Sequence, residues 1–195
     1  GLYDSECMTK SYFWRVVGRW SAPERTLALR DKADLYEAEP VGKSLLYEAD
    51  FSKDTISQFV NDTTDGYKYM LLDETHDKTP FYTFDWKGAP GHWLRAEATF
   101  TASQKEWETA KMPQFILQVV KMNGDEPEII KECLLKVSRQ LDRGDTKTLL
   151  LDMKLPKETF DAVRVCVWTA KSKLRLQVRD IRVWTFAGNT TTAAE

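Results

Sequence analysis

The chain has 195 residues, of which 42% are hydrophobic, so it can bury one substantial core in a single main domain. Its 28 basic and 30 acidic side chains nearly cancel, and no lysine- or arginine-rich block occurs. We therefore expect no nucleic-acid partner. No apolar run approaches the roughly 20 residues of a membrane-spanning helix, and the opening GLYDSECMTKS lacks the plan of a signal peptide. Because the first residue is not Met, we expect a processed chain or a piece of a longer parent protein.

Residues 1–42 differ in pattern from the rest of the chain and form a predicted N-terminal segment. The stretch from Ser21 to Glu24 is typical of a helix capping box with a proline in the first turn. It is followed by helix-favouring residues, which predicts a helix over 23–37. The apolar residues of 12–20 fit neither the helical nor the strand period, so this stretch either packs on the main domain or faces a missing part of the protein.

From about Lys43 onward, apolar and polar residues alternate in short runs separated by Gly, Pro, Asn and Asp, which is typical of half-buried strands. The runs fall at 43–51, 66–74, 80–86, 92–102, 114–122, 128–138, 146–155, 162–170 and 174–186. Residues 122–127 and 141–147 are typical of hairpin turns, and 170–173 join the last two strands tightly. No helical pattern intervenes, so we expect an all-β antiparallel sandwich over 43–186 and a disordered tail over 187–195.

The alternation also predicts which side chains face the core. The inward sets are Leu94, Ala96, Ala98 and Phe100; Leu149, Leu151, Met153 and Leu155; and Val163, Val165 and Val167. Trp93, Arg95 and Glu97 then point outward from one strand, and Arg164, Cys166 and Trp168 from another.

Tryptophan rings beside charged groups suit a sugar, because a pyranose offers CH groups for stacking and hydroxyls for polar partners. The candidate carbohydrate-binding residues are Trp93, Arg95, Glu97 and Trp168. The alternative is that the N-terminal helix covers this face and the tryptophans are packing residues.

Signatures of common enzymes are missing, since no GxGxxG, GxxxxGK, HExxH or GxSxG occurs and the chain has two histidines. We expect no catalytic residues, although Asp85, Glu97 and Asp152 remain a possible glycosidase set if their carboxylates face one another. The turn at 61–66 resembles a calcium loop only faintly and is interpreted as a polar turn.

Three cysteines without CxxC spacing argue against a disulfide framework and a zinc site. At least one thiol is expected to be free unless it pairs between chains. Cys133 and Cys166 lie in strand-like runs, where small buried residues are expected.

The end of the chain, VRVCVWTAKSKLRLQVRDIRVWTF over 163–186, resembles the last two strands of galactose-binding-like jelly rolls, the fold of many carbohydrate-binding modules. The matching residues are Val165, Val167, Trp168, Leu176, Val178, Asp180, Ile181 and Val183. The stretch LLYEADFSKD over 45–54 is similar to the opening strand of such modules. Similar endings are common in extracytoplasmic domains of Bacteroidetes surface and membrane proteins. The resemblance thus implies a two-sheet jelly roll, a glycan ligand and an extracytoplasmic location.

An acid in the last strand raises a separate question, since Asp180 interrupts an apolar alternation. In the resembling family such an acid either helps to hold a structural calcium or accepts hydrogen bonds at the sheet edge. For calcium, Asp180 would combine with Asp50 or Glu48 and backbone carbonyls. Members often carry two adjacent acids there, whereas this chain has Arg179 before Asp180, and this favours a salt bridge.

The function predicted from the sequence is a non-catalytic, galactose-binding-like sandwich module that contacts glycan. The rivals are an interaction domain that docks on its parent protein and a sandwich glycosidase.

Overall fold

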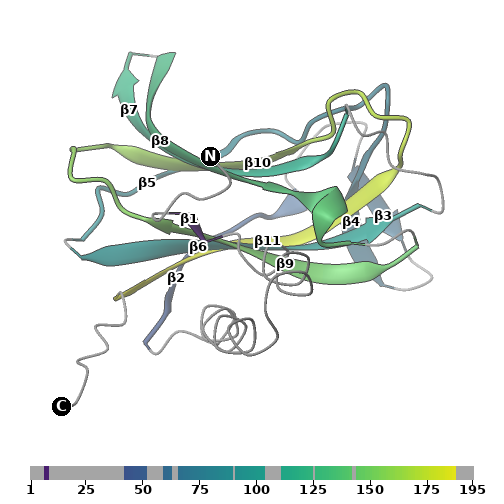
Figure 1. Ribbon diagram of the computed structural model, residues 1–195, viewed down its shortest axis with the longest axis horizontal. Coiled ribbons are helices and arrows are strands. Elements are labelled where there is room, and N and C mark those ends of the chain that lie inside the picture. The colour runs from purple at the N-terminus through teal and green to yellow at the C-terminus, as the bar shows by residue number, and fades with distance from the viewer. Residues whose placement is uncertain are drawn as a thin grey trace, which may run out of the picture.

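The computed structural model describes residues 7–8, 42–51, 59–62, 66–89, 91–103, 111–124, 126–141 and 144–187. The predicted helix over 23–37, the stretch 12–20 and the tail beyond 187 lie outside these residues. In the part described, the chain forms two antiparallel β-sheets that lie as two layers (Figure 1). This confirms the all-β prediction.

The larger layer, sheet A, has seven strands. In spatial order these are β1 (Cys7–Met8), β9 (Thr146–Lys154), β6 (His92–Ala102), β11 (Leu176–Ala187), β4 (Tyr67–Leu72) and β3 (Phe59–Asp62), and β2 (Ser44–Glu48) also pairs with β11. Sheet B has four strands, ordered β5 (Tyr82–Asp85), β10 (Ala162–Trp168), β7 (Gln114–Asn123) and β8 (Glu126–Lys136). A 3₁₀ turn, η2 (Val137–Arg139), follows β8.

The core lies between the two sheets and is built by the predicted alternation. Both sheets contribute fully buried side chains, among them Leu94, Ala96, Ala98, Phe100, Leu151, Met153, Val163, Val165 and Val167. Phe100 of sheet A meets Phe115 of sheet B edge to face, with ring centroids 5.5 Å apart. The three inward sets expected from the sequence therefore face the core, with Leu155 only partly buried against it.

All nine predicted strand runs are strands, and the structure adds two that were missed, β1 and β3. The turn at 122–127 is a hairpin within sheet B, as predicted. The tight turn at 170–173 is different, because it leads from β10 in sheet B to β11 in sheet A. Ala170 and Lys171 there have φ of 54° and 56°, and the Ser172 N–H donates to the Thr169 carbonyl at 3.0 Å.

Asp180 occupies a β-bulge in the long strand β11. The pairing of β11 with β6 shifts between Arg179 and Arg182, and Asp180 has φ of 55°. The extra residue reverses the alternation, so that Val178 before it and Ile181 after it are both buried in the core. Asp is one of the few residues that tolerate this left-handed conformation, which explains an acid at this position in backbone terms.

Two further observations concern the cysteines and the membrane. Cys133 is disulfide-bonded, with a partner outside the side chains that the structure describes, so the prediction against a disulfide was wrong for this residue. Cys166 is a free thiol and is buried, as expected for a small strand residue, and it is not among the residues of the core between the sheets. Over the described ranges, no helix has the length and apolar character needed to cross a bilayer.

Candidate ligand-binding faces

Three of the four predicted sugar-binding residues share the outer face of sheet A. Trp93, Arg95 and Glu97 alternate along β6 and pair across to β9 and β11. The fourth, Trp168, lies on β10 and belongs to the outer face of sheet B, on the opposite side of the molecule. The structure therefore does not bring the two tryptophans together in one platform.

Arg95 is engaged by Asp152 of the neighbouring strand. Its Nε donates to Asp152 Oδ1 at 2.7 Å and its Nη2 to Oδ2 at 2.8 Å. The side chains are only 2% and 3% exposed. Burial raises the pKa of the Asp152 carboxyl, and the hydrogen bonds from Arg95 oppose that change. Because both side chains are shielded from solvent, this ion pair is unsuited to receive a ligand.

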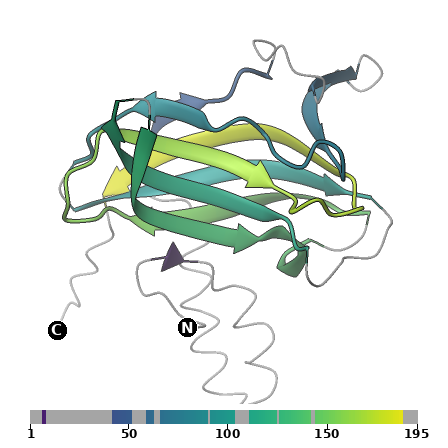
Figure 2. The same cartoon turned by 90° about the horizontal axis from the view of Figure 1, so that it is seen from above.

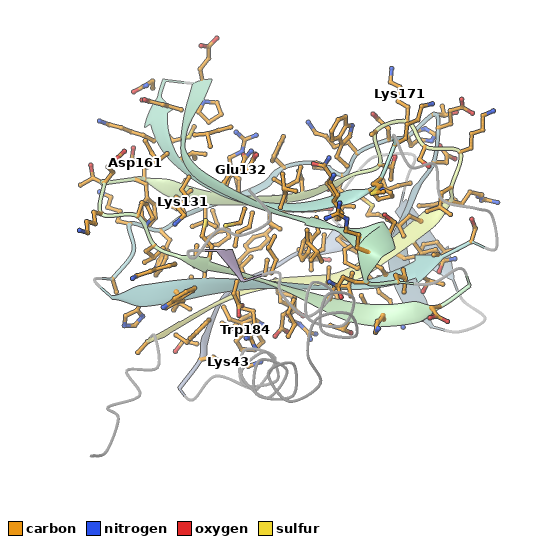
Figure 3. The ribbon with its side chains drawn as sticks, in the orientation of Figure 1. Lys43, Lys131, Glu132, Asp161, Lys171 and Trp184 are labelled. Carbon is orange, nitrogen blue, oxygen red and sulfur yellow. The ribbon has the colours of Figure 1, made fainter. Side chains whose placement is uncertain are left out.

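Glu97 is also occupied by neighbours on the same face. It accepts a hydrogen bond from Trp184 Nε1 at 2.9 Å and forms an ion pair with Lys43 Nζ at 3.4 Å. The Lys43 ammonium lies 4.1 Å from the centroid of the Trp184 ring. Figure 3 shows Lys43 and Trp184 together on this side, with Glu132 of sheet B on the opposite side of the molecule.

Trp93 stacks on Phe186, with ring centroids 6.4 Å apart and an interplanar angle of 16°. Its position in the sheet is thus that of a packed aromatic. Together with the two ion pairs, this leaves Trp93, Arg95 and Glu97 each in contact with neighbours on the outer face of sheet A.

The outer face of sheet B is organised differently, and Figure 2 looks onto it with β5, β10, β7 and β8 side by side. Trp168 is 36% exposed there. Its Nε1 donates to Asp77 Oδ2 at 3.0 Å, which holds the indole in one orientation. Lys78 makes an isolated bridge to the Trp168 backbone, so the loop before β5 reinforces this corner.

Arg164 and Gln118 are direct partners on the adjacent strands β10 and β7. The Arg164 guanidinium lies over the Phe81 ring at 3.8 Å, and Gln118 Nε2 donates to Glu132 Oε2 at 2.6 Å. Gln118 is 4% exposed, and its Oε1 has no hydrogen-bond partner. Arg164 Nε is likewise buried and without a hydrogen-bond partner. A donor on Arg164 and an acceptor on Gln118 are thus both buried without a hydrogen-bond partner, at directly paired positions of the two strands.

Exposed apolar side chains gather on this same face. The five large hydrophobic residues most exposed among the described ones are Leu45, Met122, Ile129, Leu134 and Trp168. The register of β7, β8 and β10 puts all but Leu45 on the outer face of sheet B. A surface that combines exposed apolar groups with unsatisfied polar atoms is typical of a binding face.

The predicted metal residues lie at the other sheet. Asp180 is exposed at the bulge, and its carboxylate lies 3.7 Å from Arg179 Nε, as the salt-bridge interpretation expected. The Ala49 N–H donates to the Ile181 carbonyl at 2.9 Å, so Asp50 follows on the neighbouring segment. Within the described ranges, no group of three or more His, Cys, Asp or Glu side chains gathers to hold a metal ion.

The possible glycosidase acids are divided between the sheets. Glu97 and Asp152 share the outer face of sheet A, where each already has a cationic partner. Asp85 belongs to β5 at the edge of sheet B. The three residues therefore do not form one catalytic set.

No protein-family model and no curated protein matches the chain. Among solved structures, a "Family 16 Carbohydrate Binding Module-2" is similar with 13% identity and a TM-score of 0.40 over 64% of this chain and 82% of that chain. A "Xylan-Binding Domain from CBM 22" is similar with 16% identity and a TM-score of 0.39 over 77% and 99% of the two chains. A Stig cyclase from Fischerella sp. TAU has 10% identity and a TM-score of 0.43 over 69% and 72%. Since these TM-scores are below 0.5, they assign no family, ligand or activity to this chain.

Sequence reasoning found Trp168 and noted Arg164 as outward-facing, but it missed Gln118, Glu132 and Phe81. Alternation along β7 would have placed Gln118 outward beside Arg164 had the pairing of β7 with β10 been known. The pairing of distant strands is the information that a local pattern lacks.

Proposed function

We propose that the chain is a non-catalytic carbohydrate-binding β-sandwich domain, with its ligand surface on the outer face of sheet B. The observation that carries the proposal is that Arg164 Nε and Gln118 Oε1, on directly paired residues, are both buried without a hydrogen-bond partner. The exposed Trp168 lies four residues further along the same strand. A sugar hydroxyl both donates and accepts hydrogen bonds, so one hydroxyl or a pair of neighbouring ones suits this donor and acceptor. Trp168 supplies an aromatic surface for the CH groups of a pyranose.

Both unsatisfied atoms are buried. The proposal therefore requires that the side chains above them move when a sugar binds. Arg164 is half-buried and rests on Phe81. If Arg164 rotates toward a bound sugar, its Nε gains a hydrogen bond to a sugar oxygen, and this gain favours binding.

The proposal extends to an extracytoplasmic location in a larger surface or membrane protein. The disulfide at Cys133 supports an oxidising compartment. The resemblance of 163–186 to galactose-binding-like jelly rolls, common in Bacteroidetes surface proteins, supports the jelly-roll type and the parent protein.

A second candidate function is docking on the parent protein. Met122, Ile129 and Leu134 support it, because exposed aliphatic side chains on one sheet face are also typical of protein interfaces. Trp168 suits both functions.

The test is a glycan-array screen followed by calorimetric titration of the best ligand with two matched variants. Trp168→Ala on sheet B should weaken binding by about 1–3 kcal/mol, the scale of an aromatic hot spot. Trp93→Ala on sheet A should leave the affinity unchanged. Thermal unfolding of both variants separates lost binding from lost structure.

Opposite behaviour of the two variants would move the site to sheet A, on Trp93, Arg95 and Glu97. If no glycan binds the intact chain at millimolar concentration, the carbohydrate proposal fails and docking becomes the better account.

A further inference from the structure

The charged groups on the outer face of sheet B suggest which class of sugar it takes. Arg164 makes no ion pair with any residue that the structure describes, and its guanidinium stays on the Phe81 ring. Lys78 Nζ lies 4.3 Å from the centroid of the same ring. Two cations therefore share one aromatic side chain on this face.

The carboxylates near these cations have other roles. Glu132 accepts the hydrogen bond of Gln118, and Asp77 accepts that of Trp168. Burial raises the pKa of the Cys166 thiol beneath this part of the face, and the nearby charges of Lys78 and Arg164 oppose that change.

Resting on the proposed function, we propose that the sugar bound at this face is anionic, a uronic-acid residue whose carboxylate pairs with Arg164. A guanidinium offers parallel N–H donors that match the two oxygens of a planar carboxylate. The Nε that lacks a hydrogen bond lies on one such edge. Arg164 is then the residue that determines specificity, while Trp168 provides stacking to acidic and neutral sugars alike.

The spacing of these two residues favours an oligosaccharide over a single sugar. Arg164 and Trp168 are four residues apart on the same face of β10, or about 13 Å along a strand. The acidic sugar and the stacked sugar are accordingly different units of one chain.

The experiment compares matched oligosaccharides with and without uronic-acid units, titrated against the whole chain at low and high salt. Uronate-bearing ligands should bind about tenfold or more tightly than neutral ones, the scale of a charge-assisted hydrogen bond. Arg164→Gln should remove this preference, so that uronate-bearing and neutral ligands bind this variant about equally. Lys154→Gln, which removes an equal charge from the end of β9 in sheet A, is the control and should keep the preference.

Arg164→Lys keeps the charge but not the planar fork, so it should lose much of the preference and provides a second variant if Arg164→Gln unfolds. Sulfated oligosaccharides form a further arm, and a preference for sulfate esters over uronates would overturn the carboxylate assignment. Equal binding of neutral and acidic ligands by the wild-type chain would overturn the inference and leave the proposed function standing. If no oligosaccharide binds, the proposed function itself fails.

Discussion

Arg95 and Asp152 form a two-point ion pair across strands β6 and β9, on the outer face of a sheet and yet shielded from solvent. Buried pairs of this kind contribute less through attraction than through the cost of leaving one partner alone. The pair therefore stabilises the fold and does not point to a binding site.

The first prediction concerns this pair. Asp152→Ala should lower the free energy of unfolding by about 3–5 kcal/mol, because the buried Arg95 charge would lose both hydrogen bonds to this carboxylate. Urea unfolding measures this. Arg182→Met is the control, since it removes a similar bond to the exposed Glu48 and should cost less than about 1 kcal/mol. Equal losses in the two variants would contradict the role of burial.

The backbone at Asp180 gives a second prediction. Asp180→Val should destabilise the fold by roughly 1–2 kcal/mol, because a β-branched residue is disfavoured at positive φ. Asp180→Gly should be close to neutral, since glycine adopts this conformation freely. Gln177→Val, outside the bulge on the same strand, controls for side-chain type. If Asp180→Val were as stable as wild type, the bulge would not explain the residue.

Calcium provides a third prediction at the same residue. Adding calcium should leave the melting temperature unchanged relative to a chelator, because Asp180 pairs with Arg179. A bound calcium ion would instead stabilise the folded state and raise the melting temperature. Differential scanning fluorimetry measures the shift. A rise that disappears in Asp180→Asn would instead establish a site shared with Asp50.

The fourth prediction follows from the buried thiol of Cys166. Burial raises its pKa from 9.0 to about 12. Above about pH 9 the thiol ionises in the unfolded chain but stays neutral in the folded one. The contribution of Cys166 to the free energy of unfolding is therefore intact below pH 9 and is lost as the pH rises toward 12. The loss approaches about 1.4 kcal/mol per pH unit in this window.

Unfolding titrations at pH 8 and pH 10.5 should show a larger decrease for wild type than for Cys166→Ala, which cancels the other groups that titrate there. Native protein should also resist alkylation at Cys166 until it unfolds. Rapid labelling of the folded chain would show that the thiol is accessible.

The fifth prediction compares two glycines. Both Gly88 and Gly91 have positive φ. A Cβ added to Gly88 would lie 2.9 Å from Phe160 Cζ, whereas a Cβ added to Gly91 would have no such neighbouring atom within 4 Å. Gly88→Ala should therefore cost about 1–3 kcal/mol more than Gly91→Ala, the scale of overpacking. Thermal or urea unfolding of the two variants measures the difference. Equal costs would mean that Phe160 moves aside freely.

Nine of the eleven described strands, with their buried sides, follow from the sequence alone. Val163, Val165 and Val167 face the core as alternation predicts, because successive residues of any strand point to opposite sides whatever the strand pairs with. That property is local, and a single sequence contains it.

Only the tertiary structure decided which outward faces belong together. Trp93 and Trp168 have similar surroundings in sequence, yet they lie on opposite sheets because β6 pairs with β9 and β11 while β10 pairs with β5 and β7. The bulge at Asp180 is likewise set by pairing, since one extra residue against β6 reverses the alternation. Contacts between segments far apart in the chain select these pairings, and for that reason the unsatisfied pair of Arg164 and Gln118 becomes visible only once β7 and β10 are side by side.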